Sequence, residues 1–363
     1  MEEIEKLRKE VKKVDREIIK LIGKRLSITK EIGKRKKEKG IPLRDWKVEK
    51  EVIKNALQAA SKEKLSKDLV KAIMQHIITE SKLQQEKLQS PSYTGDKEDI
   101  LIIGGLGEMG RWFANFFTNQ GHHVLIYDTK GKSKDFKCFD NLEDAINKAT
   151  CILIATPFEV MPEIIEKIIK LNFKGIVFDI ASLKSPLKSA IKKAIKHKIA
   201  YTSIHPMFGP KVSTLSDRII CICNCGNNFA DEKVKKFFKD TSVSIIETSL
   251  EEHDKKISYI LGLSHVINII FMKALMNGEY KYEELKEMAS TTFNSQLKTT
   301  KDVITENPYL YYAIQKFNPF KNKLYKNLES ALRYVIKSVK DGKKKNFINV
   351  MEEGKKWLQE EQN

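Results

Sequence analysis

Three glycines separate a short apolar run from a run of helix-forming residues. Residues 100–103 are apolar, and residues 104–110 then read G-G-L-G-E-M-G. The run of helix-favouring residues begins at Glu108, within this stretch. Glycines at the spacing of Gly105, Gly107 and Gly110 permit a tight turn, approach of the backbone to a pyrophosphate, and close packing of the helix on the strand. The N–H groups at the start of such a helix attract phosphate. The stretch therefore predicts a phosphate-binding strand–turn–helix unit.

An acidic residue after the next apolar run indicates that the phosphate belongs to a nucleotide. Residues 123–128 read H-V-L-I-Y-D, a second predicted strand that ends in Asp128, about 20 residues beyond the glycines. A carboxylate there is placed to bond the hydroxyls of an adenosine ribose and to repel a 2′-phosphate, so we predict NAD as the cofactor. A glycine-rich turn without a ligand is the alternative. The residues predicted to bind the cofactor are Gly105, Leu106, Gly107, Glu108, Met109, Gly110, Asp128 and Thr156.

His205 is the residue most suited to acid–base chemistry. Predicted strands alternate with helices in this part of the chain, which indicates a parallel sheet whose carboxyl ends collect ligands. His205 directly follows one of these strands, and Ser182 follows its neighbour. We predict that His205 takes a proton from the substrate and that Ser182 orients its ring; a structural histidine before proline is the alternative. The strands are expected near residues 100–104, 123–128, 151–155, 175–180 and 199–204.

The first 39 residues carry an apolar seam typical of one long helix that packs along its length against other helices. The seam consists of Ile4, Leu7, Val11, Val14, Ile18, Leu21, Ile28 and Ile32. Arg25 continues this series, and a guanidinium in a seam is costly unless an anion or carboxylate meets it. Lys36 lies about three turns further along the same face. The two cations favour an anion-binding site over the alternative, a dimerisation arm with surface lysines.

Two further helices are predicted before residue 90, one capped by Asp45 and one over residues 66–88. Three amphipathic helices with arginines in the seam resemble the all-helical chorismate mutase family. The resemblance implies that Arg8 reaches into the partner subunit's site, that Arg25 holds a substrate carboxylate, and that Lys36 meets the ether oxygen. Rearrangement of chorismate to prephenate needs no nucleophile, so cations that hold a dianion in a compact shape suffice.

The same resemblance assigns the remaining polar positions of the first domain. Gln85 matches the amide opposite the cation at the ether oxygen. Val48 departs from the family pattern, which usually has arginine there. The positions that match contacts to the substrate hydroxyl or to other polar groups are Asp45, Glu49 and Ser81.

The glycine turn, the I-A-S-L-K run and the H-P-M-F-G-P run together resemble prephenate dehydrogenase, and the resemblance continues to near the C-terminus. It implies that His205 takes the proton of the substrate's ring hydroxyl and that Ser182 positions this histidine. Hydride then leaves for NAD as the ring loses carbon dioxide. Many relatives carry a substrate-binding arginine within the helix predicted around residues 288–304. Lys298 is the predicted substitute here, and Lys301 is a second candidate.

Composition limits the classes of protein that the chain can represent. The net charge of +18 comes mainly from lysines interleaved with glutamates, which indicates a solvated surface that attracts anionic substrates and not a nucleic-acid binder. No uninterrupted apolar run approaches the roughly 20 residues of a membrane span. The five cysteines have no zinc-ligand spacing, so we predict reduced thiols, no metal and a cytoplasmic location.

We therefore predict a multidomain protein with an all-α three-helix domain (1–90), an α/β Rossmann-type domain (98–247) and an all-α dimerisation and substrate domain (248–363). The predicted function is a bifunctional enzyme that converts chorismate to prephenate and prephenate to 4-hydroxyphenylpyruvate, acting as a homodimer on small molecules. An arogenate-preferring dehydrogenase with an inactive helical arm is the alternative within enzymes. A basic nucleic-acid-associated protein is the alternative from another class.

Overall fold

The computed structural model describes residues 2–39, 46–88, 95–212, 215–239 and 241–359 of the chain. The chain divides into two compact units. The first unit contains the residues up to Ser182 together with Leu187–Ser249. The second contains Leu183–Pro186 and the residues from Leu250 onward, so a short piece of the central domain's sequence belongs to the C-terminal unit.

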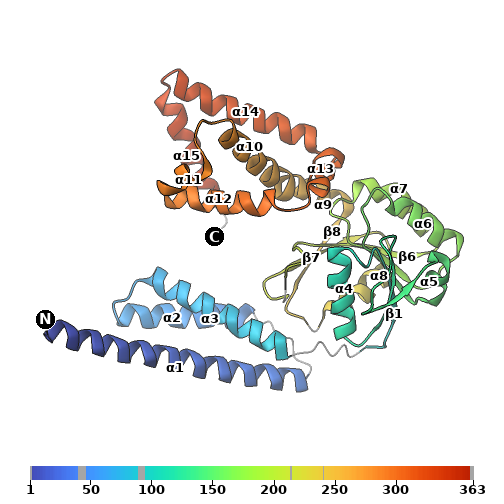
Figure 1. Ribbon diagram of the computed structural model, residues 1–363, viewed down its shortest axis with the longest axis horizontal. Helices are drawn as coiled ribbons and strands as arrows, with labels where there is room; N and C mark the ends of the chain where they lie inside the picture. Colours follow the sequence, from blue (N-terminus) through green and yellow to red (C-terminus); the bar gives the residue numbers. More distant parts are fainter. Residues whose placement is uncertain (1, 40–45, 89–94, 213–214, 240, 360–363) are drawn as a thin grey trace. The chain divides into compact units, whose positions relative to one another are not determined.

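The first unit begins with helices α1 (Glu2–Glu38), α2 (Trp46–Lys62) and α3 (Lys67–Leu88), as the sequence predicts. Helix α3 packs against both α1 and α2, and α1 extends beyond its two neighbours (Figure 1). The predicted seam residues of α1, from Ile4 to Ile32, remain 45–65% exposed. This face therefore leaves apolar area uncovered within the described chain, at a free-energy cost of about 25 cal/mol per Å².

A single eight-stranded sheet follows, in the order β3-β2-β1-β4-β5-β6-β7-β8. Its helices lie between the strands in sequence, as expected for βαβ units. The strands are β1 (Asp99–Ile103), β2 (His123–Tyr127), β3 (Lys137–Phe139), β4 (Cys151–Ile154), β5 (Ile176–Asp179), β6 (Ala200–Pro206), β7 (Ile219–Asn224) and β8 (Ser244–Ser249). The helices are α4 (Glu108–Asn119), α5 (Leu142–Lys148), α6 (Met161–Lys170), η1 (Ser185–Leu187), α7 (Lys188–Lys196) and α8 (Asn228–Phe238).

The sheet departs from the predicted all-parallel arrangement at one place. Strand β7 runs antiparallel to β6, and His205 pairs with Cys221 across this ladder. The described residues between β6 and β7 form no helix, so this connection is not a βαβ crossover and the chain turns back along β6. The two strands that the sequence analysis did not predict, β3 and β8, form the two edges of the sheet.

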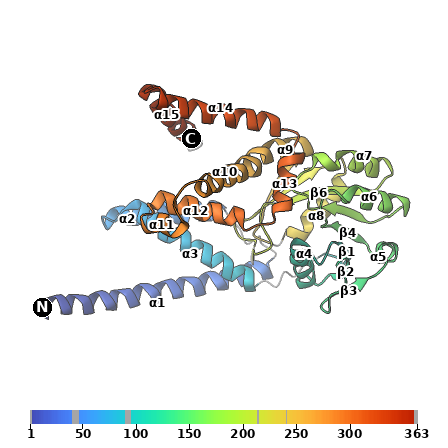
Figure 2. The same cartoon turned by 45° about the horizontal axis from the view of Figure 1, so that its top comes forward.

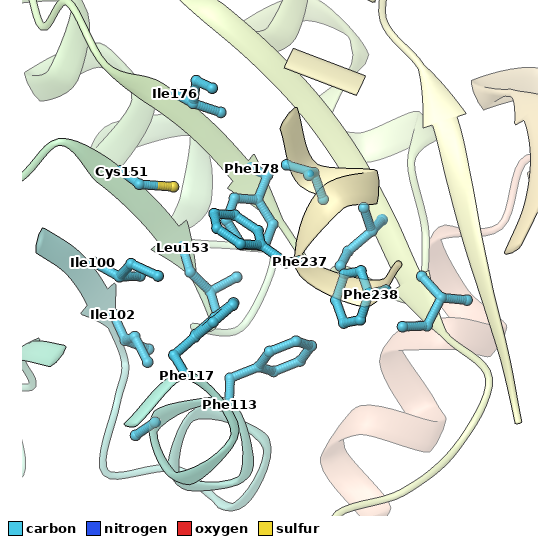
Figure 3. Close-up of a cluster of buried hydrophobic side chains, with 14 of the residues drawn as sticks. Ile100, Ile102, Phe113, Phe117, Cys151, Leu153, Ile176, Phe178, Phe237 and Phe238 are labelled. Carbon is cyan, nitrogen blue, oxygen red and sulfur yellow. The ribbon is translucent and has the colours of Figure 1, made fainter. Parts of the chain in front are cut away.

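An aromatic cluster between the sheet and two helices forms the core of this domain (Figure 3). Phe113 and Phe117 of α4 meet Phe237 and Phe238 of α8, with the rings of Phe117 and Phe237 only 5.2 Å apart. Phe178 of β5 lies 6.3 Å from Phe237, which joins the helices to the strands. The cluster fixes α4, the helix that follows the glycine turn, against the sheet.

The second unit is helical (Figure 2). The sequence pattern predicts continuous helices over residues 282–304 and 309–339, and both are interrupted. Ser290 caps α12 with a 3.1 Å bond from the Phe293 N–H, and Asn318 ends α13. A π-helical turn, η2, separates α9 from α10. The elements are α9 (Leu250–Ile257), η2 (Ser258–Leu263), α10 (Ser264–Met276), α11 (Tyr282–Glu287), α12 (Thr291–Ile304), α13 (Pro308–Phe317), α14 (Lys321–Lys340) and α15 (Lys344–Gln359).

One helical stretch of the second unit, Leu250–Met276, is long and apolar enough to cross a membrane by length and composition alone. The sequence pattern predicts its apolar part, residues 257–276, as a helix more hydrophobic than a surface helix needs. Only 17% of its most apolar window is buried. The core helix of a soluble protein meets the same criterion of length and composition.

Candidate active sites

The glycine turn between β1 and α4 has a backbone that only small residues can form. Gly104 adopts φ +85°, and a Cβ added there would lie 2.8 Å from the carbonyl oxygen of Ala155. A Cβ on Gly110 would collide with the Gly104 carbonyl, whereas one on Gly107 would meet only that oxygen, at 3.3 Å. Gly110 thus packs the helix against the turn and Gly107 faces more open space, as the dinucleotide fingerprint requires. Gly104, which the sequence analysis did not select, makes the turn itself.

Helix α4 begins directly after Gly107, which has no side chain to cap the helix. The first N–H groups of the helix are therefore available to phosphate oxygens. Arg111 lies in the first turn of α4, and its Nε donates to the Leu106 carbonyl at 3.1 Å. Its guanidinium places a positive charge beside the glycine turn. The sequence analysis gives this arginine no role.

Asp128 lies immediately after β2 and binds the turn directly. Its Oδ2 accepts the Leu106 N–H at 2.8 Å, and its Oδ1 accepts the Lys130 N–H at 2.9 Å. Thr156, at the end of β4, has a buried hydroxyl with no hydrogen-bond partner in the described chain. An unsatisfied buried hydroxyl at the carboxyl edge of the sheet is what a polar ligand at this edge would satisfy. The glycine turn, Asp128 and Thr156 therefore fit a bound dinucleotide.

His205 and Ser182 lie at the same edge of neighbouring strands. Asp179 of β5 pairs in register with Ser203 of β6, and both Ser182 and His205 follow that pair. His205 is 5% exposed and lies next to Pro206, the last residue of β6. The predicted acid–base residue and its predicted orienting serine thus lie on adjacent strand ends, at the edge where the dinucleotide turn also lies.

A buried carboxylate shapes the loop that carries Ser182. Asp179 is fully buried, and its Oδ1 accepts the Ala181 N–H at 2.9 Å while its Oδ2 accepts the Tyr201 hydroxyl at 2.9 Å. Burial, together with the neighbouring Asp179 carboxylate, raises the pKa of Tyr201 well above its usual value, so this phenol stays protonated and keeps donating. The pair fixes the direction in which the chain leaves β5.

The second unit holds the next residues of that loop through Asp254. Its carboxylate accepts the N–H groups of Lys184 (3.0 Å) and Ser185 (2.6 Å) and contacts His253 Nδ1 at 2.8 Å. Burial alone would raise the pKa of Asp254, but the bonds from His253, Ser185 and Lys184 hold it below its ordinary value. Lys184 is itself fully buried. Sequence reasoning missed Asp254 and Lys184 as a pair because they are far apart along the chain.

Lys298, the predicted substitute for a substrate-binding arginine, lies exposed on α12. The same helix is fixed to α10 by Asn268, whose Oδ1 accepts from Thr300 (2.7 Å) and Gln296 (2.9 Å). Lys298 therefore projects from a helix whose position is well fixed within its unit.

The helical domain brings several of its predicted residues together. Arg25 Nη1 donates to Ser81 Oγ at 3.0 Å, and partial burial lowers the pKa of this guanidinium below its usual value. Glu49 of α2 pairs with Lys82 of α3 at 2.9 Å, a lysine that the sequence analysis did not select. Lys36 is half-buried on α1. The Arg25–Ser81 bond thus joins α1 to α3, and the Glu49–Lys82 pair joins α2 to α3.

Other predicted positions stand apart from this region or outside the described chain. Arg8 is exposed on the N-terminal part of α1. Val48, where the family pattern has arginine, is 52% exposed on α2. Asp45 and the side chain of Gln85 lie outside the described residues.

The fold and these two groups of residues define a helical anion-binding domain joined to a nucleotide-dependent dehydrogenase. Residues 7–86 match chorismate mutase type II, residues 113–247 match the nucleotide-binding domain of prephenate dehydrogenase, and residues 249–353 match its dimerization domain. The chain belongs to the family of bifunctional chorismate mutase–prephenate dehydrogenases.

Individual relatives agree with this assignment. The T-protein of Enterobacter agglomerans is 22% identical over 357 residues, which cover 98% of this chain and 93% of that protein. A probable arogenate/prephenate dehydrogenase of Methanocaldococcus jannaschii is 26% identical over 268 residues, covering 71% of this chain and 60% of that protein. The crystal structure of prephenate dehydrogenase from A. aeolicus with hydroxyphenyl propionate and NAD+ shares the fold, with a TM-score of 0.60, 16% identity, and coverage of 74% of this chain and 99% of that one.

Proposed function

We propose that the chain catalyses two consecutive steps of tyrosine biosynthesis, from chorismate to prephenate and from prephenate to 4-hydroxyphenylpyruvate. The observation that carries the proposal is the order of the three matched domains within a single chain. We assign the first step to residues 1–90, cofactor binding to residues 98–247, and dimerisation with part of the substrate site to residues 248–363.

The first step is a rearrangement within one molecule, so the domain has to hold chorismate in a compact shape and stabilise charge on the breaking ether oxygen. Arg25 binds a carboxylate of the substrate, and its bond from Nη1 to Ser81 fixes the guanidinium in direction. Lys36 and Gln85 meet the ether oxygen. Glu49 and Asp45 bind the hydroxyl and the other polar groups, and Arg8 completes the site of a second subunit.

The cofactor of the second step is NAD, which accepts a hydride when bound. Its pyrophosphate lies against the turn of Gly105–Gly110 and the start of α4, and Asp128 binds the ribose hydroxyls. The Oδ2 bond from the Leu106 N–H leaves further lone pairs on the same carboxylate for those hydroxyls. Thr156 donates its hydroxyl to the bound nucleotide.

The proton of the second step goes to His205. As the hydroxyl-bearing carbon of prephenate loses hydride, its oxygen becomes a carbonyl and its proton has to pass to a nearby acceptor. A neutral imidazole suits that role near neutral pH. Ser182 bonds the other ring nitrogen and fixes the tautomer. Lys298 contributes a positive charge for a substrate carboxylate.

The active protein is a homodimer in the cytoplasm that binds no nucleic acid. The seam of α1 and the apolar side of α10, where Ile267, Ile269 and Ile270 are 38–43% exposed, are the surfaces that a second copy covers. The match to a dimerization domain supports this use of α10. The lysines that give the chain its charge are interleaved with glutamates and form no arginine-rich or aromatic nucleic-acid face.

A coupled assay tests the proposal. Purified protein supplied with chorismate and NAD should produce reduced cofactor and 4-hydroxyphenylpyruvate. The same protein supplied with prephenate and NAD should form the same products, because this step does not need the activity of the first domain. Absence of turnover from prephenate would refute the dehydrogenase assignment. Turnover from prephenate without turnover from chorismate would refute only the mutase assignment.

A second substrate is favoured by one finding, since the relative from M. jannaschii is named as an arogenate/prephenate dehydrogenase. Arogenate carries an amino group where prephenate carries a keto oxygen. Parallel measurement of kcat/KM with both compounds decides between them.

A further inference from the structure

Trp112 connects the loop that follows His205 to α4, the helix that follows the glycine turn. Trp112 lies in the first turns of α4, and its indole Nε1–H donates to the carbonyl of Val212 at 2.7 Å. The ring of Trp112 also lies 5.1 Å from that of Phe208, with 59° between the planes. Trp112 therefore contacts residues 207–212 at two points, one polar and one apolar.

The loop is also held at its start and within itself. The Met207 N–H donates to the carbonyl of Ile219 at 2.9 Å, and the Val212 N–H donates to the carbonyl of Gly209 at 3.3 Å within the loop. Gly209 has open space where a Cβ would be. Trp112 connects the far end of the loop, at Val212, to α4.

Trp112 itself belongs to an aromatic stack. Phe116, one turn further along α4, stacks on Trp112 with centroids 5.4 Å apart and planes 11° apart, and Phe116 stacks in turn on Phe238 of α8 at 5.4 Å and 16°. A side chain in such a stack has few alternative rotamers. The indole N–H is therefore preorganised toward Val212.

We propose that Trp112 is a positioning residue that holds residues 207–212 in place to bind the substrate, on the same helix whose start binds the cofactor. The inference rests on the proposed dehydrogenase function. His205 must touch the reacting hydroxyl, so the loop that starts two residues later borders the rest of the substrate. His205 itself is held by the β6–β7 ladder and not by Trp112. Loss of Trp112 therefore weakens substrate binding more than the proton transfer.

Two variants separate the two contacts. Trp112→Phe keeps an aromatic ring against Phe208 and removes the N–H donor, whereas Trp112→Leu removes both. Loss of one hydrogen bond is worth roughly 5-fold, and loss of the aromatic contact as well should bring the effect to about 10-fold or more. Trp357→Phe is the matched control, because it makes the same chemical change at a tryptophan of α15 that is 67% exposed.

The expected result is that KM for prephenate rises about 5-fold in Trp112→Phe and about 10-fold or more in Trp112→Leu. In both variants kcat should stay within about 3-fold of the wild type, and the dissociation constant of NAD should not change. Trp357→Phe should leave KM for prephenate near the wild-type value. A fall in kcat with KM unchanged, or an equal rise of KM in the control, would overturn the proposal.

Hydrogen exchange gives a readout that needs no activity. In both Trp112 variants the amides of residues 207–212 should exchange faster while those of β1, β4 and β5 keep their protection. Faster exchange spread over the whole sheet would mean that Trp112 only supports the core, and would also overturn the proposal. If the wild-type protein failed to oxidise prephenate, the proposed function would fail while the exchange measurement still tested the tie between Trp112 and the loop.

Discussion

The carboxylate of Asp128 accepts the backbone N–H of Leu106 at 2.8 Å, so the residue predicted to bind the cofactor's ribose also orders the turn that binds its pyrophosphate. These two parts of the cofactor site belong to different strands, and one hydrogen bond joins them. Binding of the ribose and the shape of the glycine turn are therefore not independent properties of this domain.

This relationship predicts different effects for two substitutions of Asp128. Asp128→Asn keeps an oxygen that can accept the Leu106 N–H but removes the charge, so it should mainly reduce the preference for NAD over NADP. Asp128→Ala also loses the bond to the turn, and its NAD dissociation constant should rise about 10-fold to 100-fold, as for a lost hydrogen bond to a charged group. Fluorescence titration with both cofactors measures these values. If the ratio of the NADP dissociation constant to the NAD dissociation constant were unchanged in both variants, the role of Asp128 at the ribose would be contradicted.

Arg25 offers a test of the first domain that leaves the second intact. In the proposed mutase site Arg25 holds a carboxylate of the substrate, and loss of a contact that fixes the reactive geometry can cost about 10²-fold in rate, so Arg25→Ala should lower the mutase activity by about that factor. Oxidation of supplied prephenate should continue at the wild-type rate. Ser81→Ala, which removes only the bond to Nη1, should have a smaller effect, because the guanidinium keeps its charge and loses its fixed direction.

The sharing of mutase sites between subunits can be tested with the same variant. If Arg8 reaches the partner's site, a mixture of Arg8→Ala and Arg25→Ala chains forms some dimers with one intact site, and mixing should restore part of the activity that each variant lacks. Equal amounts of the two chains, unfolded and refolded together, should reach up to about a quarter of the mutase activity of the wild type, from random pairing of two subunits. No recovery in the mixture, with dimers shown to form, would place Arg8 outside the site.

Local patterns explain why the sequence predicted most of the fold. The glycine turn, the β1–α4 unit and the three N-terminal helices follow from spacing over a few residues, and the structure confirms them. The antiparallel return of β7 was missed, since Cys221 and its neighbours read like any buried strand and direction is set by the connection. The break at Ser290 was missed because a single cap residue within a helical pattern is a weak signal.

The candidate site residues were predictable where chemistry and local context coincide, as at Asp128 and His205. Gly104 was missed because either Gly104 or Gly105 could make the turn. Only the backbone φ of +85° identifies Gly104 as the residue that does so. Asp254 and Trp112 were missed for another reason. Each acts on residues far away in sequence, Lys184 and Val212, and no periodicity in the sequence records such a pair.

His265 predicts a pH dependence of stability. Its ring is 7% exposed, stacks 3.9 Å from Tyr311, and has no partner for Nδ1 among the described residues. Burial lowers its pKa to about 4, from an ordinary value of about 6.5. Because the folded state takes up this proton less readily than the unfolded state, stability is fully present above pH 6.5 and is lost as the pH falls toward about 4.

Urea unfolding of the wild type and of His265→Phe at several pH values measures this effect. The phenyl ring can still stack on Tyr311 but takes up no proton, so the variant should lose less stability between pH 6.5 and 4. The slope of the free energy of unfolding against pH should differ between the two proteins by less than about 1.4 kcal/mol per pH unit, the limit for one proton. Burial lowers the pKa of His122 to about 4 as well, so part of the acid sensitivity should remain. Substitution of the exposed His76 by phenylalanine is the control, and an effect as large as that of His265→Phe would contradict the assignment.

The last prediction concerns His205 and follows from its place at the end of β6. If its imidazole takes the proton of the substrate hydroxyl, His205→Asn should lower the dehydrogenase turnover by about 10²–10⁴-fold, the usual range for a general base. The NAD dissociation constant should barely change, because the glycine turn and Asp128 lie on other strands. Mutase activity should persist, since its residues lie on α1 to α3. Stopped-flow measurement of reduced cofactor over pH 5–9 tests the role directly: the fall in rate on the acidic side, where the wild-type imidazole becomes protonated, should be absent from the variant. A variant with near-normal turnover and the same acidic fall would move the base to another histidine, with His253 and His265 as the next candidates.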